Sequence, residues 1–398
     1  MRLLGKMRWA LFGLLCAGVM PGAASLVSTA SATPPKAKCL IVNQRTDLRY
    51  PTLQAANDAA ETVAGDTVMV KGTCVGTTIL GKNLNIVGKS NPGFGVATLD
   101  GDNMGTVVTV SPGIRVEITG VKITGGNGNS VTVIHGAGNS GGGVFNNAGS
   151  LVLSNMVVTG NTAGNGGGIY NFLGSLTVID STVSDNIGNT QETPLEFVSY
   201  QGGGIFNGGC HPFIECSSQA ALTITNSTIT HNAGGGIVNG YAASLALENS
   251  TVSNNTAMAG AGIRTQGQVA LSSSAITGNT ATAGSGGGLL AVRFGAATLT
   301  NSSVSGNTAA ADGGGIALFL AGLTLTNSTV AANTATHHGG GILNSGGGAW
   351  LTNSTVTGNR LTSPDGRGGG IYNEDAGLNL TNSTVVGNIP DDIVFASL

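Results

Sequence analysis

Five ionisable residues form the best group in this sequence for acid–base chemistry. They are Asp312, His337, His338, Asp365 and Arg367, and each precedes a glycine triplet by a few residues at most. Two carboxylates at a set separation can hydrolyse a glycosidic bond, and a base beside calcium-binding carboxylates can act in a polysaccharide lyase. These five residues are the catalytic candidates of the sequence, although a solvated turn explains them more simply.

A second ionisable group lies in two insertions that lengthen neighbouring repeats, at 187–201 and 208–221. It consists of Glu192, Glu196, His211 and Glu215. Long loops on a rigid scaffold often carry function, but a drifted loop explains these residues equally well.

Three aromatic residues recur at one position of consecutive repeats: Phe145, Tyr170 and Phe206. Each follows an aliphatic residue expected to point inward, so we expect the aromatic side chains to point outward. An exposed strip at steps of about 5 Å would suit stacking on sugar rings or binding a partner's apolar patch. The alternative is that an insertion folds back and buries the strip.

These residues must be positioned by a repeat whose most regular element is a glycine triplet. The element begins at Gly141, Gly166, Gly202, Gly234, Gly260 (as Gly-Ala-Gly), Gly286, Gly313, Gly339 and Gly368, at intervals of 25 to 36 residues. Such a period indicates a solenoid. No helix is expected after the glycines, which excludes a nucleotide-binding loop.

Each repeat reads as three short strands. Residues 323–327 alternate leucine with threonine, the pattern of a half-buried strand. A second strand has one inward residue, such as Val356, and a third begins at an isoleucine after the glycines, such as Ile342. We therefore predict an all-β fold, a right-handed single-stranded parallel β-helix of about eleven coils with an N-terminal helical cap.

Two asparagine rows are spaced six residues apart in nine coils. The first row is Asn155, Asp180, Asn226, Asn249, Ser273, Asn301, Asn327, Asn353 and Asn382, and the second is Asn161, Asn186, Asn232, Asn255, Asn279, Asn307, Asn333, Asn359 and Asn388. Asparagine tolerates left-handed backbone, and stacked amides can bond from coil to coil. Both rows are predicted to be structural, and they account for six triplets that resemble glycosylation acceptors.

The chain begins with a segment typical of an export signal. Arg2, Lys6 and Arg8 precede an apolar run at 9–20 that is too short to span a membrane. Cleavage is expected after Ala24 or, preferably, after Ala32. The predicted organisation is a signal peptide at 1–32, a cap and first coil at 33–105, and β-helix repeats at 106–398. The product is expected to be secreted, either extracellular or at the cell surface.

The amino-acid composition restricts the classes of partner that this protein can bind. Charged residues make up 9% of the chain, and removing 1–32, with three basic and no acidic residues, changes the net charge from −3 to −6. Such a surface offers nothing to nucleic acid. No later apolar stretch is long enough to be a transmembrane helix.

Four cysteines follow the signal, and export permits disulfides. Cys210 and Cys216 lie in one insertion, so we expect them to pair. Cys39 and Cys74 would then pair by elimination and fix the cap, although four cysteines allow three connectivities. A helix is predicted at 51–60 with Pro51 in its first turn, covering the open end of the first coil, and the first strand is predicted at 67–71.

Several segments of the cap carry a resemblance to a known family. Residues 53–56 (LQAA), 65–68 (GDTV), 98–101 (TLDG) and 121–126 (VKITGG) resemble the opening of bacterial secreted β-helix proteins of the pectate-lyase-like superfamily. The Gly-Asn-Thr-Ala and Gly-Gly-Gly-Ile-Tyr-Asn patterns are similar to chlamydial polymorphic outer membrane protein repeats. The resemblance implies the β-helix fold, and proteins of this type include adhesins as well as polysaccharide-cleaving enzymes.

The favoured interpretation is a noncatalytic protein that binds glycans or partner proteins and is a monomer. The first alternative is a polysaccharide lyase or glycoside hydrolase, and the second is a structural spacer. No cofactor is expected, and calcium would be needed only by a lyase.

Overall fold

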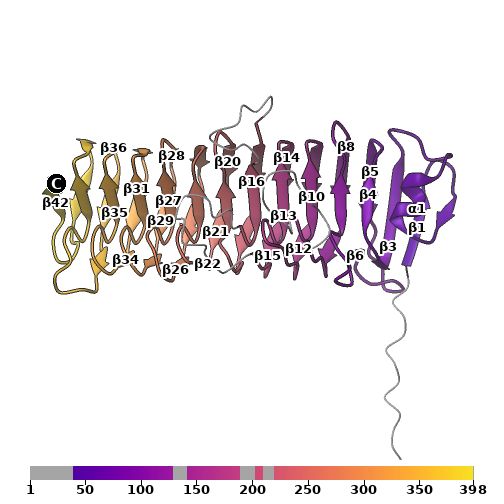
Figure 1. The fold of residues 1–398 in the computed structure, drawn as a ribbon, viewed down its shortest axis with the longest axis horizontal. Coiled ribbons are helices and arrows are strands. Elements are labelled where there is room, and N and C mark those ends of the chain that lie inside the picture. The colour runs from indigo at the N-terminus through magenta and orange to yellow at the C-terminus, as the bar shows by residue number, and fades with distance from the viewer. Residues whose placement is uncertain (1–38, 129–140, 189–201, 209–218, 398) are drawn as a thin grey trace, which may run out of the picture. The chain divides into compact units, whose positions relative to one another are not determined.

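The computed structural model describes residues 39–128, 141–188, 202–208 and 219–397. These residues belong to one compact unit, Ala37–Leu398. In it the chain winds into coils stacked along one axis, with the strands of each coil beside those of the next (Figure 1). In the described ranges, no helix is long and apolar enough to cross a membrane.

Each coil contributes one strand to each of three faces. The first face contains β5 (Leu84–Gly88), β8 (Arg115–Thr119), β11 (Ser150–Ser154), β14 (Ser175–Ile179), β17 (Ala221–Thr225), β20 (Ser244–Glu248), β24 (Gln268–Ser272), β28 (Ala296–Thr300), β32 (Gly322–Thr326), β36 (Gly348–Thr352) and β40 (Gly377–Thr381). The second face contains β6 (Thr98–Asp100), β9 (Lys122–Thr124), β12 (Val157–Thr159), β15 (Thr182–Ser184), β18 (Thr228–Thr230), β21 (Thr251–Ser253), β25 (Ala275–Thr277), β29 (Ser303–Ser305), β33 (Thr329–Ala331), β37 (Thr355–Thr357) and β41 (Thr384–Val386). The third face contains β4 (Thr78–Leu80), β7 (Val108–Val110), β10 (Val144–Asn147), β13 (Ile169–Phe172), β16 (Ile205–Gly208), β19 (Ile237–Asn239), β23 (Ile263–Thr265), β27 (Leu289–Val292), β31 (Ile316–Phe319), β35 (Ile342–Ser345), β39 (Ile371–Glu374) and β42 (Ile393–Ala396).

A fourth, very short strand follows the second asparagine in five coils. These strands are β22 (Thr256–Ala257), β26 (Thr280–Ala281), β30 (Thr308–Ala309), β34 (Thr334–Ala335) and β38 (Arg360–Leu361). They explain the recurring Asn-Thr-Ala sequence, which the three-strand prediction left unassigned.

The core fills the space between the faces. Neighbouring coils pair in register, so that Leu325 lies beside Leu351 of the next coil. Leu323 and Leu325 are 1% and 0% exposed, whereas Thr324 between them points outward. The predicted alternation is confirmed, and each such leucine stabilises the coil by about 2–5 kcal/mol relative to alanine.

The second asparagine row is buried and forms a ladder through the core. Asn279 Nδ2 donates to Asn307 Oδ1 at 3.0 Å, and the backbone N–H of Asn279 donates to the same oxygen at 2.9 Å. The ladder runs from Asn161 to Asn388 and ends at Asp392. Hydrogen bonds from the backbone and side chain of Asn388 lower the pKa of Asp392. The predicted ladder is confirmed.

The glycine triplets let successive coils approach each other closely. A Cβ added to Gly341 would lie 2.7 Å from the backbone oxygen of Gly370 and 2.9 Å from the amide nitrogen of Asn359. No side chain fits there, because the neighbouring atoms belong to the next coil and to the buried ladder.

The N-terminal end of the solenoid is covered by a small cap. Its helix α1 (Leu53–Asp58) begins later than predicted: Thr52 is the N-cap, and its Oγ1 accepts from Ala55 N at 3.1 Å. Pro51 therefore precedes the helix, whereas the sequence predicted that Pro51 would lie in its first turn. The strand predicted at 67–71 continues as β3 (Thr67–Val75).

The cap also contains antiparallel strands that the repeat pattern did not predict. Strand β1 (Cys39–Asn43) pairs with both β2 (Arg49–Tyr50) and β3. A disulfide joins Cys39 to Cys74, the pairing expected from the sequence.

An ion pair between Arg45 and Asp66 stabilises the cap. Asp66 accepts from Arg45 Nε at 2.6 Å, from Asn43 Nδ2 at 2.7 Å and from the backbone N–H of Val63 at 2.9 Å. The hydrogen bond from Arg45, with those from Asn43 and Val63, holds the pKa of Asp66 well below its usual range.

Candidate functional site

The chain turns sharply between the first and second faces, and we call this turn the elbow. In the nine coils from Asn155 onward, the elbow begins with a residue of the first asparagine row, such as Asn301 with φ of +50°. The nine residues of that row have φ between 48° and 52°, the left-handed region that asparagine tolerates better than most residues. The left-handed backbone of this row agrees with the prediction that the row is structural.

A serine follows in most elbows and forms a second ladder, which sequence reasoning missed. Ser274 Oγ accepts from the backbone N–H of Ser250 at 3.1 Å and donates to the carbonyl of Ser272 at 2.8 Å. The repeated Asn-Ser-Thr triplet is the sequence pattern that indicates this ladder. The asparagine adopts the left-handed conformation that turns the chain, and the serine hydroxyl accepts a hydrogen bond from the preceding coil. The threonine begins the next strand.

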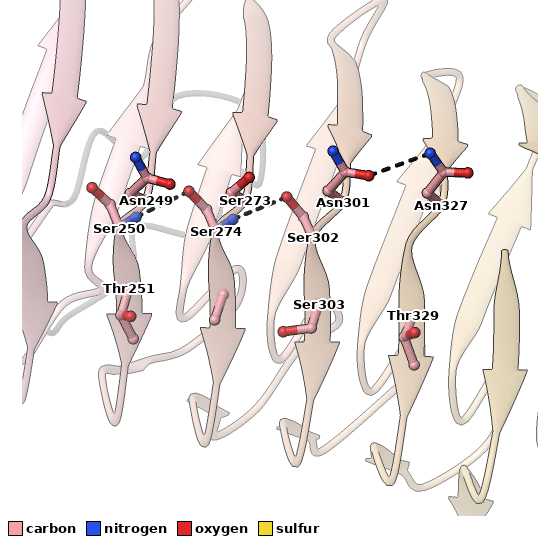
Figure 2. Close-up of a pocket in the computed structure, with 11 residues that line it drawn as sticks. Asn249, Ser250, Thr251, Ser273, Ser274, Asn301, Ser302, Ser303, Asn327 and Thr329 are labelled. Atoms are coloured by element: carbon pink, nitrogen blue, oxygen red, sulfur yellow. Dashed lines mark hydrogen bonds between the residues drawn. The ribbon is translucent and has the colours of Figure 1, made fainter.

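A groove of about 400 Å³ follows the outer side of the elbow across four coils (Figure 2). Its lining residues are small and uncharged: Asn249, Ser250, Thr251, Ser273, Ser274, Ala275, Asn301, Ser302, Ser303, Asn327 and Thr329. Amides and hydroxyls both donate and accept hydrogen bonds. The groove can therefore hold an uncharged polar ligand, and none of its lining side chains can act as an acid or base near neutral pH.

Exposed amides lie on the rim of this groove at Asn249, Asn301 and Asn327, with Ser273 between the first two, and the row continues beyond the groove at Asn353. Asn327 Nδ2 donates to Asn301 Oδ1 at 3.3 Å, and Asn353 Nδ2 donates to Asn327 Oδ1 at the same distance. All three are exposed. Their spacing of about 4.8 Å presents equivalent polar groups to a ligand that extends along the axis.

The turns that precede the glycine triplets carry the one side-chain hydrogen bond within the first ionisable group that the structure records among the described residues. Asp312 Oδ1 lies 3.1 Å from His338 Nδ1 and also accepts from the backbone N–H of His338 at 3.0 Å. The His338 ring lies 4.5 Å, between centroids, from the ring of Tyr372. A half-exposed histidine held by a carboxylate can store or transfer a proton.

The other members of this group are less closely associated with the pair. The ring of His337 is 6.4 Å from that of His338, and Arg367 pairs with His338 through the backbone. Asp365 is exposed, and its backbone N–H donates to Ser363. In the described ranges, no three His, Cys, Asp or Glu side chains are placed to hold a metal ion.

The aromatic strip is in register, but its predicted exposure is wrong. Phe145 pairs with Tyr170 and Tyr170 with Phe206, and the three side chains are 1%, 6% and 1% exposed. Their ring centroids are 5.4 and 4.9 Å apart, and they pack with Val238 in a cluster of their own. The turn at each glycine triplet runs over the outward residue: a Cβ on Gly141 would lie 2.9 Å from that of Phe145. These residues form a second, outer row of packing.

Some predicted site residues lie outside the described ranges. They are Glu192, Glu196, Cys210, His211, Glu215 and Cys216, with most of both insertions. The second disulfide and the second ionisable group stay predictions.

The comparisons with known proteins support the fold and do not establish an activity. The family model described as right handed beta helix region matches residues 212–388. A search of curated proteins found no match.

Three solved structures are similar over most of this chain. The periplasmic alginate epimerase AlgG is 11% identical with a TM-score of 0.46, covering 96% of this chain and 98% of its own. PfbA, a surface adhesin of Streptococcus pneumoniae, is 15% identical with a TM-score of 0.36, covering 82% and 84%. The Dettilon tailspike protein is 12% identical with a TM-score of 0.37, covering 83% and 61%. The strand pairings and the family match together show that the chain is a right-handed parallel β-helix protein of about eleven coils.

Proposed function

We propose that this chain is an exported, noncatalytic β-helix protein of the extracellular space or cell surface that binds glycans or partner proteins. The observation that carries the proposal is the elbow groove. It presents amides and hydroxyls on a backbone fixed by two ladders, so little conformational entropy is lost when a ligand binds. Glycans suit it better than proteins, because their hydroxyls match its donors and acceptors.

Export is supported by the disulfide between Cys39 and Cys74. Disulfides form and persist in oxidising compartments and are rare in the cytosol. The expected signal segment at 1–32 fits the same location.

Filling the groove tests this proposal. Ala275 lines it and points outward from β25, so Ala275→Trp would obstruct it without replacing a residue of either ladder. Ala270→Trp is the matched control, since Ala270 is exposed on β24 of the same coil and does not line the groove.

The chain from Thr33 onward would be tested for retention on immobilised cellulose, xylan, mannan and polygalacturonate. We expect at least a tenfold loss of affinity for a neutral polysaccharide with Ala275→Trp and little change with Ala270→Trp. Equal effects of the two variants would exclude the groove as the binding site. No retention on any polymer would contradict glycan binding and favour the spacer interpretation.

The second candidate is a polysaccharide lyase or glycoside hydrolase. The contact between Asp312 and His338 favours it, because a carboxylate can orient a histidine that acts as a general base. Wild-type protein would be incubated with the same polymers, with and without calcium. Product release that is lost in His338→Ala but kept in Asp365→Ala would establish the enzyme.

A further inference from the structure

An exposed tryptophan lies on the first face, away from the elbow groove. Trp350 points outward from the middle of β36 and is 52% exposed, although large aromatic side chains are usually buried. Its inward neighbours Ala349 and Leu351 are 1% exposed each, so the strand itself is well packed. The exposed indole is therefore a surface feature and not a sign of a loose coil.

The indole is folded down onto the sheet. A Cβ added to Gly348 would lie 2.7 Å from Trp350 Cζ3 and 3.2 Å from Cζ2, so the benzene edge of the ring covers that glycine. Gly348 is buried, whereas its register partners Gly322 and Gly377 are not. One side of the ring thus rests against backbone, and the rest remains open to solvent.

Uncharged polar groups flank the ring on both neighbouring coils. Trp350 pairs with Thr324 on one side and with Asn379 on the other, each about 4.8 Å away along the axis. Thr324 is half-buried and Asn379 exposed. An apolar surface with hydroxyl and amide groups beside it matches a sugar ring, which has an apolar C–H face and polar hydroxyls at its edge.

Further apolar side chains lie at the turn between the third and first faces. Phe294 is 84% exposed and Leu320 58% exposed, and Phe294 N donates to the carbonyl of Leu320 at 2.8 Å. Leu320 in turn leans over the next coil, where a Cβ on Gly346 would lie 2.8 Å from its Cδ2. Phe294, Leu320 and Trp350 come from three successive coils, so their apolar surface extends over about 10 Å along the axis.

We infer that Trp350, with Thr324 and Asn379, forms a stacking platform for neutral pyranose polysaccharides, distinct from the elbow groove. This inference deepens the proposed glycan-binding function and rests on it. The ligand class is neutral because the outward positions of β32, β36 and β40 carry threonine, asparagine, tryptophan and glycine, with no charge to pair with a uronate.

The sequence provides a reporter at this site. The chain contains two tryptophans, Trp9 and Trp350, so the chain from Thr33 onward has Trp350 alone. Cellohexaose, xylohexaose and mannohexaose would be titrated while tryptophan emission and acrylamide quenching are recorded. We expect at least one of them to shift the emission to shorter wavelength and to halve the quenching, and an oligogalacturonate of equal length to do neither.

Two glycine variants separate the platform from general effects on the fold. Gly348→Ala should displace the ring and weaken binding at least fivefold, since the added methyl occupies the place of the indole edge. Gly322→Ala is the matched control, because its Cβ would meet only Ala296 at 3.8 Å. Trp350→Ala should weaken binding at least tenfold, measured by calorimetry.

Unchanged Trp350 emission with all three neutral oligosaccharides would overturn the platform. If those sugars or their polymers still bound and Ala275→Trp abolished binding, the proposed function would stand with the groove as its site. If no glycan bound by any method, both the platform and glycan binding would fall.

Discussion

Single polar residues in this protein are positioned by several hydrogen bonds each. In the buried ladder, Asn307 donates to Asn333 Oδ1 and to the carbonyl of Ile276, and its own oxygen accepts two bonds from Asn279. An exposed residue such as Asn301 instead supplies a left-handed turn and one long amide contact. A substitution in the buried row therefore removes several hydrogen bonds, whereas a substitution in the exposed row removes a residue that favours the left-handed turn.

We expect Asn307→Ala to lower the free energy of unfolding by about 2–4 kcal/mol, because buried groups of neighbouring coils lose their partners. Asn301→Gly keeps the left-handed turn and should cost less than about 1 kcal/mol. Urea unfolding followed by circular dichroism measures both. Equal losses would contradict the assignment of distinct roles to the two rows.

Asp66 should make the cap sensitive to acid. Its folded pKa is lowered, chiefly by the hydrogen bond from Arg45. Its contribution to stability is therefore fully present above the unfolded pKa of about 3.9 and is lost as the pH falls through the folded pKa. Asp66→Asn should destabilise the protein at pH 6, and the difference from wild type should shrink at pH 3. A difference that is constant between these pH values would show that the ion pair contributes nothing.

Among the structural elements, the glycine triplets impose the strictest requirement on side-chain size. A methyl group on Gly341 would contact both the next coil and Asn359, so neighbouring coils would have to separate. Gly341→Ala should cost roughly 3 kcal/mol or more, whereas Gly322→Ala, on a strand with room for a methyl, should cost under about 1 kcal/mol. Thermal unfolding of the two variants would measure this, and a similar loss from both would contradict the account of coil contact.

The strands and asparagine rows could be predicted because the sequence patterns that produce them lie within a single repeat. Alternation at residues 323–327 and the fixed six-residue spacing are visible within one repeat. The burial of Phe145 was not predictable in this way, since it depends on the path of a turn over the outer face. Trp350 was missed for a related reason: its alternation predicts an outward position, but its site is completed by Thr324 and Asn379 of other coils.

Taken whole, the molecule is a solenoid in which each coil contacts only its neighbours. Its stability is then close to a sum of coil and neighbour terms, and a perturbation stays near its origin. The N-terminal end is protected by α1 and by β1, which pairs with β3. That protection is needed because an open strand edge can pair with another chain.

The disulfide should act locally on that end. Cys39 and Cys74 are separated by 35 residues, and closing a loop of this size stabilises by about 4 kcal/mol in the chain-entropy estimate. Cys39→Ser with Cys74→Ser should therefore increase hydrogen exchange in β1 and β3 at least tenfold while leaving β32 and β36 unchanged. Analytical ultracentrifugation should then detect association through the freed strand edge. Uniform loss of protection along the chain would instead mean that the coils unfold as one cooperative unit, and that the cap controls the stability of the whole helix.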